Sequence, residues 1–250
     1  MTDREIRQIR YGSMDVSYAS RLNGGGMGFG QDYVPVIRKK FGRVKRACEF
    51  ASGPGFIGFS LLAHGLCDSL CLIDVNPDTI ELCKKTIREN HLENRVSAFV
   101  SDGLAGVPES EYRQWDLVVS NPPHFDGSEA EYGENILLID PGWRIHKEFY
   151  AGIKKFLAPG GSVLFMENGD GSRGDVWRPM AAGAGLAWKG AFSYKPFSLY
   201  LRHRRAYYSR DKNPGMKTRV MRLGKAVLAP VLYLKWRMSY PYYFTWSENI

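Results

Sequence analysis

Between residues 46 and 194 the chain alternates short apolar runs with segments of more mixed composition. Five continuously apolar runs predict strands buried on both faces: residues 47–51, 69–74, 96–101, 115–120 and 162–167. Three segments predict helices between them: residues 56–64, 77–90 and 142–157. Two further strands are predicted at 186–194 and 197–208. This alternation indicates an α/β fold, with a doubly wound, mostly parallel seven-stranded sheet and helices on both faces.

The first 41 residues lack this alternation. Residues 1–22 are polar and aperiodic, which predicts a loosely packed arm or a short helix. Residues 23–30 contain five glycines, so this segment is either flexible or pressed closely against another group. A short amphipathic helix is predicted at 31–41.

The glycine-rich segment also has a functional interpretation. Residues 24–33 are interpreted as a lid that closes over a ligand, with Phe29, Gln31 and Asp32 supplying contacts. A flexible linker is the alternative.

The charge of the chain is concentrated at its C-terminal end. The net charge is +8, but the residues from Lys195 onward contain 12 Lys or Arg and only two acids, Asp211 and Glu248. The same 56 residues hold 11 of the 33 aromatic side chains. We therefore predict three regions: an N-terminal arm and glycine-rich lid at 1–41, a ligand-binding domain at 42–210, and a basic, aromatic C-terminal extension at 211–250.

Several roles remain open for this basic extension. Cations neutralise phosphates and aromatic rings stack on unpaired bases, so RNA is one candidate partner. Residues 220–238 also form a basic segment with apolar stripes, which could lie on an anionic membrane surface or cover a hydrophobic patch of the sheet. Packing on its own domain or on a partner subunit is the third alternative. If the extension is separable, truncation after about residue 210 should leave ligand binding intact.

Other classes of protein are disfavoured by what the sequence lacks. No apolar run approaches the ~18 residues that cross a bilayer, and the first ten residues have charges without an apolar core, so we expect a cytoplasmic location. The four cysteines, at positions 48, 67, 71 and 83, form no CxxC pair and no zinc-ligand spacing. We expect buried reduced thiols and no metal.

Candidate ligand-binding residues lie where the predicted strands end, because open α/β sheets bind ligands at the carboxyl ends of their strands. After the first strand, Gly53, Gly55 and Gly58 fit the pattern G-x-G-x-x-G, in which glycines allow the backbone to approach a ligand closely. This pattern alone is equally compatible with a dinucleotide-binding enzyme that uses NAD.

Two further strand ends carry a carboxylate. Asp74 can accept hydrogen bonds from a ribose diol, or it can cap the following helix. Asp102, followed by Gly103, can receive an adenine amino group, or it can be a turn residue. Three successive strand ends with suitable groups favour a nucleoside-containing ligand.

The fourth strand ends in Asn121-Pro122-Pro123-His124-Phe125. Two prolines remove two backbone donors, so carbonyl oxygens and the Asn121 side-chain oxygen remain as acceptors for a planar NH2 group. Such acceptors orient the nitrogen toward an electrophile. The alternative is a proline-rich turn.

His124 admits three interpretations. Its ring can stack on, or hydrogen-bond to, a planar substrate; it can accept a proton near neutral pH; or it can simply pack. Phe125, the next residue, is a candidate substrate contact.

These motifs, over residues 42–169, resemble the Rossmann-like (class I) S-adenosylmethionine-dependent methyltransferases, in the small-domain branch typified by the release-factor glutamine N-methyltransferases. The resemblance implies S-adenosylmethionine as cofactor, bound by Glu49, Ala51, Gly53, Gly55, Asp74, Val75, Asp102, Gly103 and Asn121. It also implies that Asn121, Pro122 and Pro123 present the substrate nitrogen. Two features depart from the family pattern: His124 replaces an aromatic Tyr or Phe, and a shorter N-terminal segment replaces a helical domain.

The predicted function is methylation of a planar nitrogen, with a Gln or Asn side-chain amide of a protein or peptide as first choice. An exocyclic amine of RNA or DNA is the alternative acceptor. A cofactor-binding module without transfer activity is the alternative of another class. An NAD-dependent oxidoreductase is disfavoured because the Asn-Pro-Pro-His motif has no role in hydride transfer.

Overall fold

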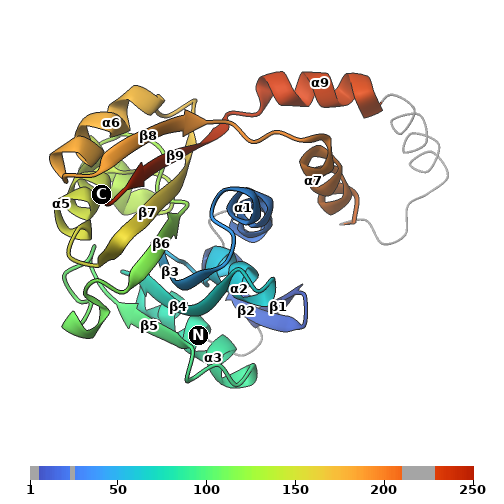
Figure 1. The fold of residues 1–250 in the computed structure, drawn as a ribbon. Coiled ribbons are helices and arrows are strands. Elements are labelled where there is room, and N and C mark those ends of the chain that lie inside the picture. The colour runs from blue at the N-terminus through green and yellow to red at the C-terminus, as the bar shows by residue number, and fades with distance from the viewer. Residues whose placement is uncertain (1–5, 23–25, 210–228) are drawn as a thin grey trace. The chain divides into compact units, whose positions relative to one another are not determined.

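The computed structural model describes residues 6–22, 26–209 and 229–250 (Figure 1). The chain divides into two compact units, one formed by residues 1–192 with 243–250 and the other by residues 193–242. The first unit contains the predicted sheet. The second contains part of the basic extension.

A seven-stranded sheet forms the centre of the first unit, in the order β5-β4-β3-β6-β7-β9-β8 (Figure 1). Its strands are β3 (Val44–Phe50), β4 (Cys67–Asp74), β5 (Val96–Val100), β6 (Trp115–Ser120), β7 (Leu157–Asn168), β8 (Ala187–Phe192) and β9 (Tyr242–Glu248). The pairs β3/β4, β3/β6, β4/β5 and β6/β7 are parallel, and β8/β9 is antiparallel. The strand order reverses beside β3. The predicted α/β fold with a mostly parallel seven-stranded sheet is confirmed.

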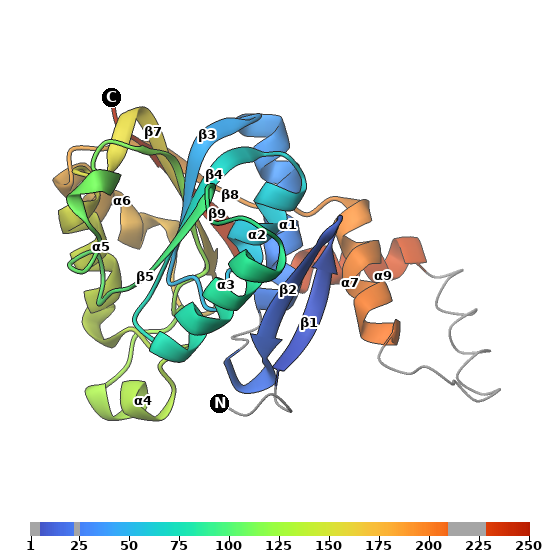
Figure 2. The same ribbon diagram turned by 90° about the horizontal axis from the view of Figure 1, so that it is seen from below.

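Helices cover both faces of this sheet (Figures 1 and 2). One face carries α1 (Gly26–Lys40), α2 (Phe56–Ala63) and α3 (Pro77–Glu89), and the other carries α5 (Arg144–Ile153) and α6 (Gly174–Gly183). The short α4 (Glu129–Glu134) lies in the connection after β6. Single 3₁₀ turns are η2 (Ser20–Leu22), η3 (Glu109–Glu111) and η4 (Pro141–Trp143).

Aromatic side chains fill the core between β3, β6, β7 and the helix α5. Phe50 packs on Phe149 with ring centroids 4.7 Å apart, and Trp115 stacks on Phe156 at 4.6 Å. Burial of each such ring contributes about 1.5–3 kcal/mol to folding. The four cysteines are free and buried, as predicted.

The N-terminal segment is not a loose arm. It forms a hairpin of β1 (Ile6–Tyr11) and β2 (Met14–Ala19), in which Tyr11 and Val16 are fully buried. The Ser17 amide donates to Thr86 Oγ1 of α3 at 3.0 Å. The prediction was wrong because polar residues of these strands bond to α3, a partner that local patterning does not reveal.

The seventh strand was also wrongly placed. Residues 197–208, predicted as a strand, belong to the helix α7 (Phe197–Ser209), and the seventh strand of the sheet is β9 instead. Phe244 of β9 is buried and stacks on Phe192 of β8, with centroids 5.6 Å apart. The strand β9 therefore lies within residues 211–250, which were predicted to be an extension outside the sheet. The observed units divide the chain after residues 192 and 242, whereas the predicted boundary lay between residues 210 and 211.

The second unit contains α7 and α9 (Ala229–Ser239). Their contact is aromatic, with Tyr200 of α7 beside Tyr233 and Trp236 of α9 at centroid distances of 5.8 and 5.7 Å. The Tyr233 hydroxyl donates to the Lys195 carbonyl at 2.6 Å. Among the described residues, no helix is both long and apolar enough to span a bilayer.

Candidate active site

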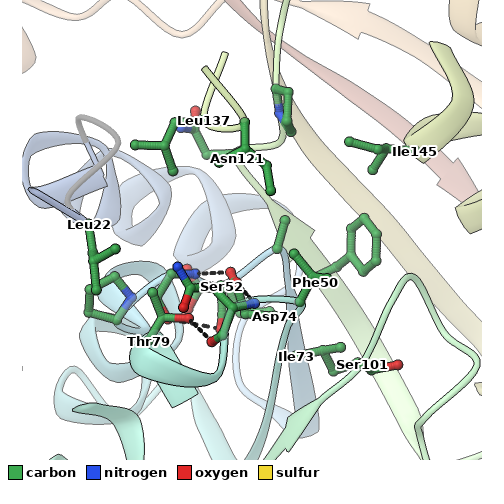
Figure 3. Close-up of a pocket in the computed structure, with 18 of the residues that line it drawn as sticks. Leu22, Phe50, Ser52, Ile73, Asp74, Thr79, Ser101, Asn121, Leu137 and Ile145 are labelled. Atoms are coloured by element: carbon green, nitrogen blue, oxygen red, sulfur yellow. Dashed lines mark hydrogen bonds between the residues drawn. The ribbon is translucent and has the colours of Figure 1, made fainter. Parts of the chain in front are cut away.

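A pocket opens at the carboxyl ends of β3, β4, β5 and β6, where the strand order reverses (Figure 3). Nine of the residues predicted for the site line it: Glu49, Ala51, Gly53, Asp74, Val75, Asp102, Gly103, Asn121 and Pro123. The other predicted residues with described side chains are outside its lining: Gly55, Pro122, His124, Phe125, Gln31 and Asp32. The tertiary structure therefore brings together groups from four separate strand ends.

The turn after β3 has an unusual backbone. Ala51, Gly53 and Gly55 have φ angles of 49°, 49° and 79°, a region that glycine tolerates and alanine rarely adopts. A Cβ on Gly55 would also come within 2.8 Å of the Phe59 ring. The glycines of the G-x-G-x-x-G pattern thus have a structural reason in this chain, since they shape the turn that borders the pocket.

Glu49 connects this turn to α2. Its buried carboxylate accepts hydrogen bonds from the backbone amides of Ile57 at 3.2 Å and Gly58 at 2.7 Å. A Cβ on Gly58 would lie 2.9 Å from the same carboxylate, so only glycine leaves room for it. Burial raises the pKa of Glu49 to about 8, against the effect of the two amides. Glu49 therefore borders the pocket and also fixes the first turn of the helix behind it.

Asp74 ties two loops of the pocket together (Figure 3). Its Oδ2 accepts from the Gly53 amide at 2.7 Å and its Oδ1 from the Asn76 amide at 2.8 Å. Burial raises the pKa of Asp74, and the hydrogen bonds from these amides oppose that shift. The cap of α3 is Asn76, so the helix-capping interpretation of Asp74 was wrong. Thr79 also hydrogen-bonds to this carboxylate through its side chain. Since an ionised carboxylate has about four acceptor sites, Asp74 retains capacity for a further donor.

Asp102 and Gly103 form the edge of the pocket after β5, and Asp102 is exposed. Ser101 shapes this loop, because its hydroxyl donates to the Gly103 carbonyl at 3.1 Å and accepts from the Gly106 amide at 2.8 Å. An exposed carboxylate on an ordered loop suits a hydrogen-bond donor that approaches from the pocket.

The Asn121 side chain carries an unsatisfied acceptor. Its Oδ1 is buried and has no hydrogen-bond partner, and the residue lines the pocket on the side opposite Asp74 in the view of Figure 3. The preceding residue is held firmly, since Ser120 Oγ donates to the Phe50 carbonyl at 2.6 Å and Tyr33 donates to the Ser120 carbonyl. A buried acceptor without a partner costs free energy, which a donor on a ligand would recover.

His124 lies behind the pocket rather than in its lining. The amides of His124 and Phe125 both donate to the Leu138 carbonyl at 3.0 Å, which pins the end of the motif to the loop before α5. The His124 ring is buried, with Nδ1 3.6 Å from Glu167 Oε2. Stacking of this ring on a substrate is therefore not supported by its place in the structure.

A buried acid–base cluster that local sequence patterns did not predict lies next to His124. His146 contacts Asp140 through Nδ1 at 2.6 Å and Glu167 through Nε2 at 3.2 Å. Burial alone would lower the pKa of His146, but the two carboxylates raise it to about 9. The same histidines hold the pKa of Glu167 below its usual value despite burial. The sequence feature that could have indicated this cluster is Glu167, a charged residue at the end of the otherwise apolar predicted strand at 162–167.

The predicted lid is mainly helical. From Gly26 onward the segment belongs to α1, whereas residues 23–25 lie outside the described part of the chain, as does the Phe29 side chain. A Cβ on Gly30 would meet the Phe56 carbonyl at 2.4 Å, so this glycine permits close packing of α1 on α2. Asp32 is buried. The loop interpretation was wrong from Gly26, and ligand contact by Phe29, Gln31 and Asp32 remains a prediction.

A sequence model of the family "Methyltransferase small domain" matches residues 33–170, which is more than half of the chain. The chain belongs to the methyltransferase small domain family. The predicted resemblance is confirmed, and the residues matched include every strand that borders the pocket. The expected enzyme class and cofactor, a methyltransferase that uses S-adenosylmethionine, agree with this membership.

Relatives of known name include both protein and RNA methyltransferases. The chain is 28% identical over 131 residues to release factor glutamine methyltransferase of Clostridium acetobutylicum, covering 48% of this chain and 46% of the relative. It is 28% identical over 120 residues to ribosomal RNA small subunit methyltransferase C of Pseudomonas aeruginosa, covering 48% of this chain and 31% of the relative. The chain thus matches less than half the length of these relatives.

Solved structures share the fold at low identity. Geranyl diphosphate C-methyltransferase from Streptomyces coelicolor, in complex with S-adenosyl-L-homocysteine, superposes with a TM-score of 0.53 at 8% identity, covering 88% of this chain and 80% of that one. A putative tRNA methyltransferase of Streptococcus pneumoniae gives 0.52 at 10% identity, covering 87% and 69%. These likenesses confirm the Rossmann-like methyltransferase fold.

Proposed function

We propose that the protein is an S-adenosylmethionine-dependent N-methyltransferase whose acceptor is the side-chain amide of Gln or Asn in a protein or peptide. The observation that carries this proposal is the buried, unpartnered Oδ1 of Asn121, which borders the pocket at the reversal of strand order. Membership of the methyltransferase small domain family supports the cofactor.

The lining of the pocket fits S-adenosylmethionine. Asp74 keeps acceptor capacity for the ribose hydroxyls after binding two backbone amides, and exposed Asp102 is available to the adenine amino group. The turn around Gly53 lets the backbone approach the methionine portion. Glu49 already bonds to α2, so we assign it the positioning of this turn.

Bound S-adenosylmethionine supplies an electrophilic methyl group. The chain's own contribution is orientation, because Asn121 Oδ1 can accept one N–H of a planar NH2 group, while Pro122 and Pro123 offer no competing backbone donor. With this N–H held, the nitrogen can turn its lone pair toward the methyl carbon. Because an amide nitrogen is hardly basic, it must lose one N–H proton to water during or after formation of the N–C bond, while the electron pair of the broken S–C bond stays on the sulfur of the released cofactor product.

An exocyclic amine of RNA or DNA is the second candidate acceptor. It is also a planar NH2 group, and the excess of Lys and Arg after residue 195 favours a polyanion. The third candidate, a cofactor-binding module without transfer activity, predicts cofactor binding and no methylated product.

Methylation of cell extract with radiolabelled S-adenosylmethionine distinguishes these candidates. We expect the radiolabel to be released by protease and not by nuclease. Asn121→Ala should reduce the incorporated label by about 100-fold, while calorimetry should still detect cofactor binding by this variant. Asn94→Ala, which changes an exposed asparagine away from the pocket, is the matched control.

Each other outcome selects a different candidate. Label that only nuclease releases would show that the acceptor is an exocyclic amine of RNA or DNA and not a side-chain amide. Cofactor binding without a methylated product in any extract would show that the protein is a cofactor-binding module without transfer activity.

A further inference from the structure

The helix α9 presents an aliphatic stripe on its surface. Val231, Leu234 and Met238 are 64, 56 and 82% exposed. Their spacing of three and then four residues places all three on one face of the helix. Together they form a continuous exposed apolar line along the helix.

The aromatic residues of α9 lie on its opposite face. Tyr233 and Trp236 pack against Tyr200 of α7, and Trp236 also packs on Tyr240 with centroids 4.6 Å apart. These rings hold the two helices together. The surface stripe therefore offers aliphatic groups, which cannot stack on nucleic-acid bases as aromatic rings do.

Positive charge flanks the stripe. Lys235 and Arg237 are exposed, and helical geometry places one on each side of the line from Val231 to Met238. The unit of residues 193–242 contains 12 Lys or Arg and one acid, Asp211. An apolar line bordered by cations complements the interface of an anionic bilayer, with acyl chains below and phosphates alongside.

We propose that α9 binds in the plane of an anionic lipid bilayer, with the stripe inserted among the acyl chains and Lys235 and Arg237 on the headgroup phosphates. With 11 residues, α9 is about half as long as a spanning helix, so it lies along the surface. This inference does not depend on the acceptor of the methyl group.

Co-sedimentation with lipid vesicles tests the proposal. The full chain should sediment with vesicles of phosphatidylcholine and phosphatidylserine, and only weakly with phosphatidylcholine alone. Val231→Ser/Leu234→Ser/Met238→Ser should lower the partition coefficient at least about tenfold. Lys235→Glu/Arg237→Glu should lower it as well, and added salt should weaken binding by the full chain.

Ile250→Ser is the matched control, because it removes an aliphatic side chain that is 85% exposed outside this unit. Circular dichroism and cofactor binding check that the variants fold. The proposal is overturned if the chain does not sediment with anionic vesicles, or if the triple serine variant sediments as the parent does. Binding of single-stranded RNA without binding of vesicles also overturns it, in favour of a nucleic-acid partner.

Discussion

At the scale of single residues, Glu167 shows how a buried charge is made tolerable in this protein. Its carboxylate is fully buried at the end of β7 but lies 3.2 Å from His146 Nε2 and 3.6 Å from His124 Nδ1. Asp140 holds the other nitrogen of His146 at 2.6 Å and also accepts from the Ile145 amide at the start of α5. Such a cluster is stable only while its partners remain paired. Through the His124 contact it also steadies the strand end that carries Asn121.

His146 should make stability depend on pH. The folded protein raises the pKa of His146 from 6.5 to about 9, so its proton is held more tightly than in the unfolded chain. This contribution, on the order of 3 kcal/mol, is complete below pH 6.5 and is lost as the pH rises through about 9. Urea unfolding of the parent between pH 6.5 and about pH 9 should show a decrease in the free energy of unfolding, and His146→Gln should show a smaller decrease over the same range.

Nuclear magnetic resonance provides a second measurement on the parent protein, which is needed if His146→Gln does not fold. The buried imidazole should titrate near pH 9. Titration near the ordinary pKa of histidine would contradict the paired cluster.

At the scale of elements, contact between α1 and α2 depends on one glycine. Gly30 faces the backbone of Phe56, and a Cβ at this position would come within 2.4 Å of the carbonyl oxygen. A flexible side chain could move aside, but a backbone carbonyl inside a helix cannot. The glycine-rich segment thus supports close helix packing, which its composition alone did not distinguish from flexibility.

Gly30→Ala should lower the free energy of unfolding by about 1–3 kcal/mol, because the helices must separate to admit the methyl group. Gly133→Ala in α4, where an added Cβ meets nothing within 4 Å, is the control and should be neutral or slightly stabilising. Chemical denaturation measures both. Equal effects of the two substitutions would show that α1 does not pack on α2 as described.

At the scale of the whole molecule, the end of the chain returns to the sheet. β9 lies between β7 and β8, and Phe192 of β8 is paired in register with Phe244 of β9. The basic segment of residues 193–242 is therefore an insertion between two neighbouring strands rather than a terminal extension. Truncation after residue 210 would remove a strand, so the expectation that it spares ligand binding is withdrawn.

Two deletions test this arrangement. Removal of residues 210–250 should prevent folding, because it exposes the edges of β7 and β8 and the partners of Phe244. Replacement of residues 193–242 by a short Gly-Asn turn should leave a folded protein that still binds S-adenosylmethionine, because it joins two paired antiparallel strands. Circular dichroism and calorimetry read both outcomes. Cofactor binding by the first deletion and not by the second would reverse the assignment.

Much of this protein was predictable from local sequence. Continuous apolar runs predicted the strands from β3 to β7. The groups at their ends predicted nine of the residues that line the pocket, since parallel strands necessarily present their carboxyl ends along one edge. Asp74 and Asn121 were found in this way, and both line the pocket.

Only the tertiary structure decided the rest. β9 is separated from β8 by the whole basic segment, and the cluster around Glu167 joins side chains from β7, α5 and two loops. For His124 the sequence left stacking, proton transfer and packing open, and the structure places its ring in the interior beside Glu167. Local periodicity reports which face of an element is apolar. It does not report which distant segment covers that face, and the pairing of buried charges depends on that choice.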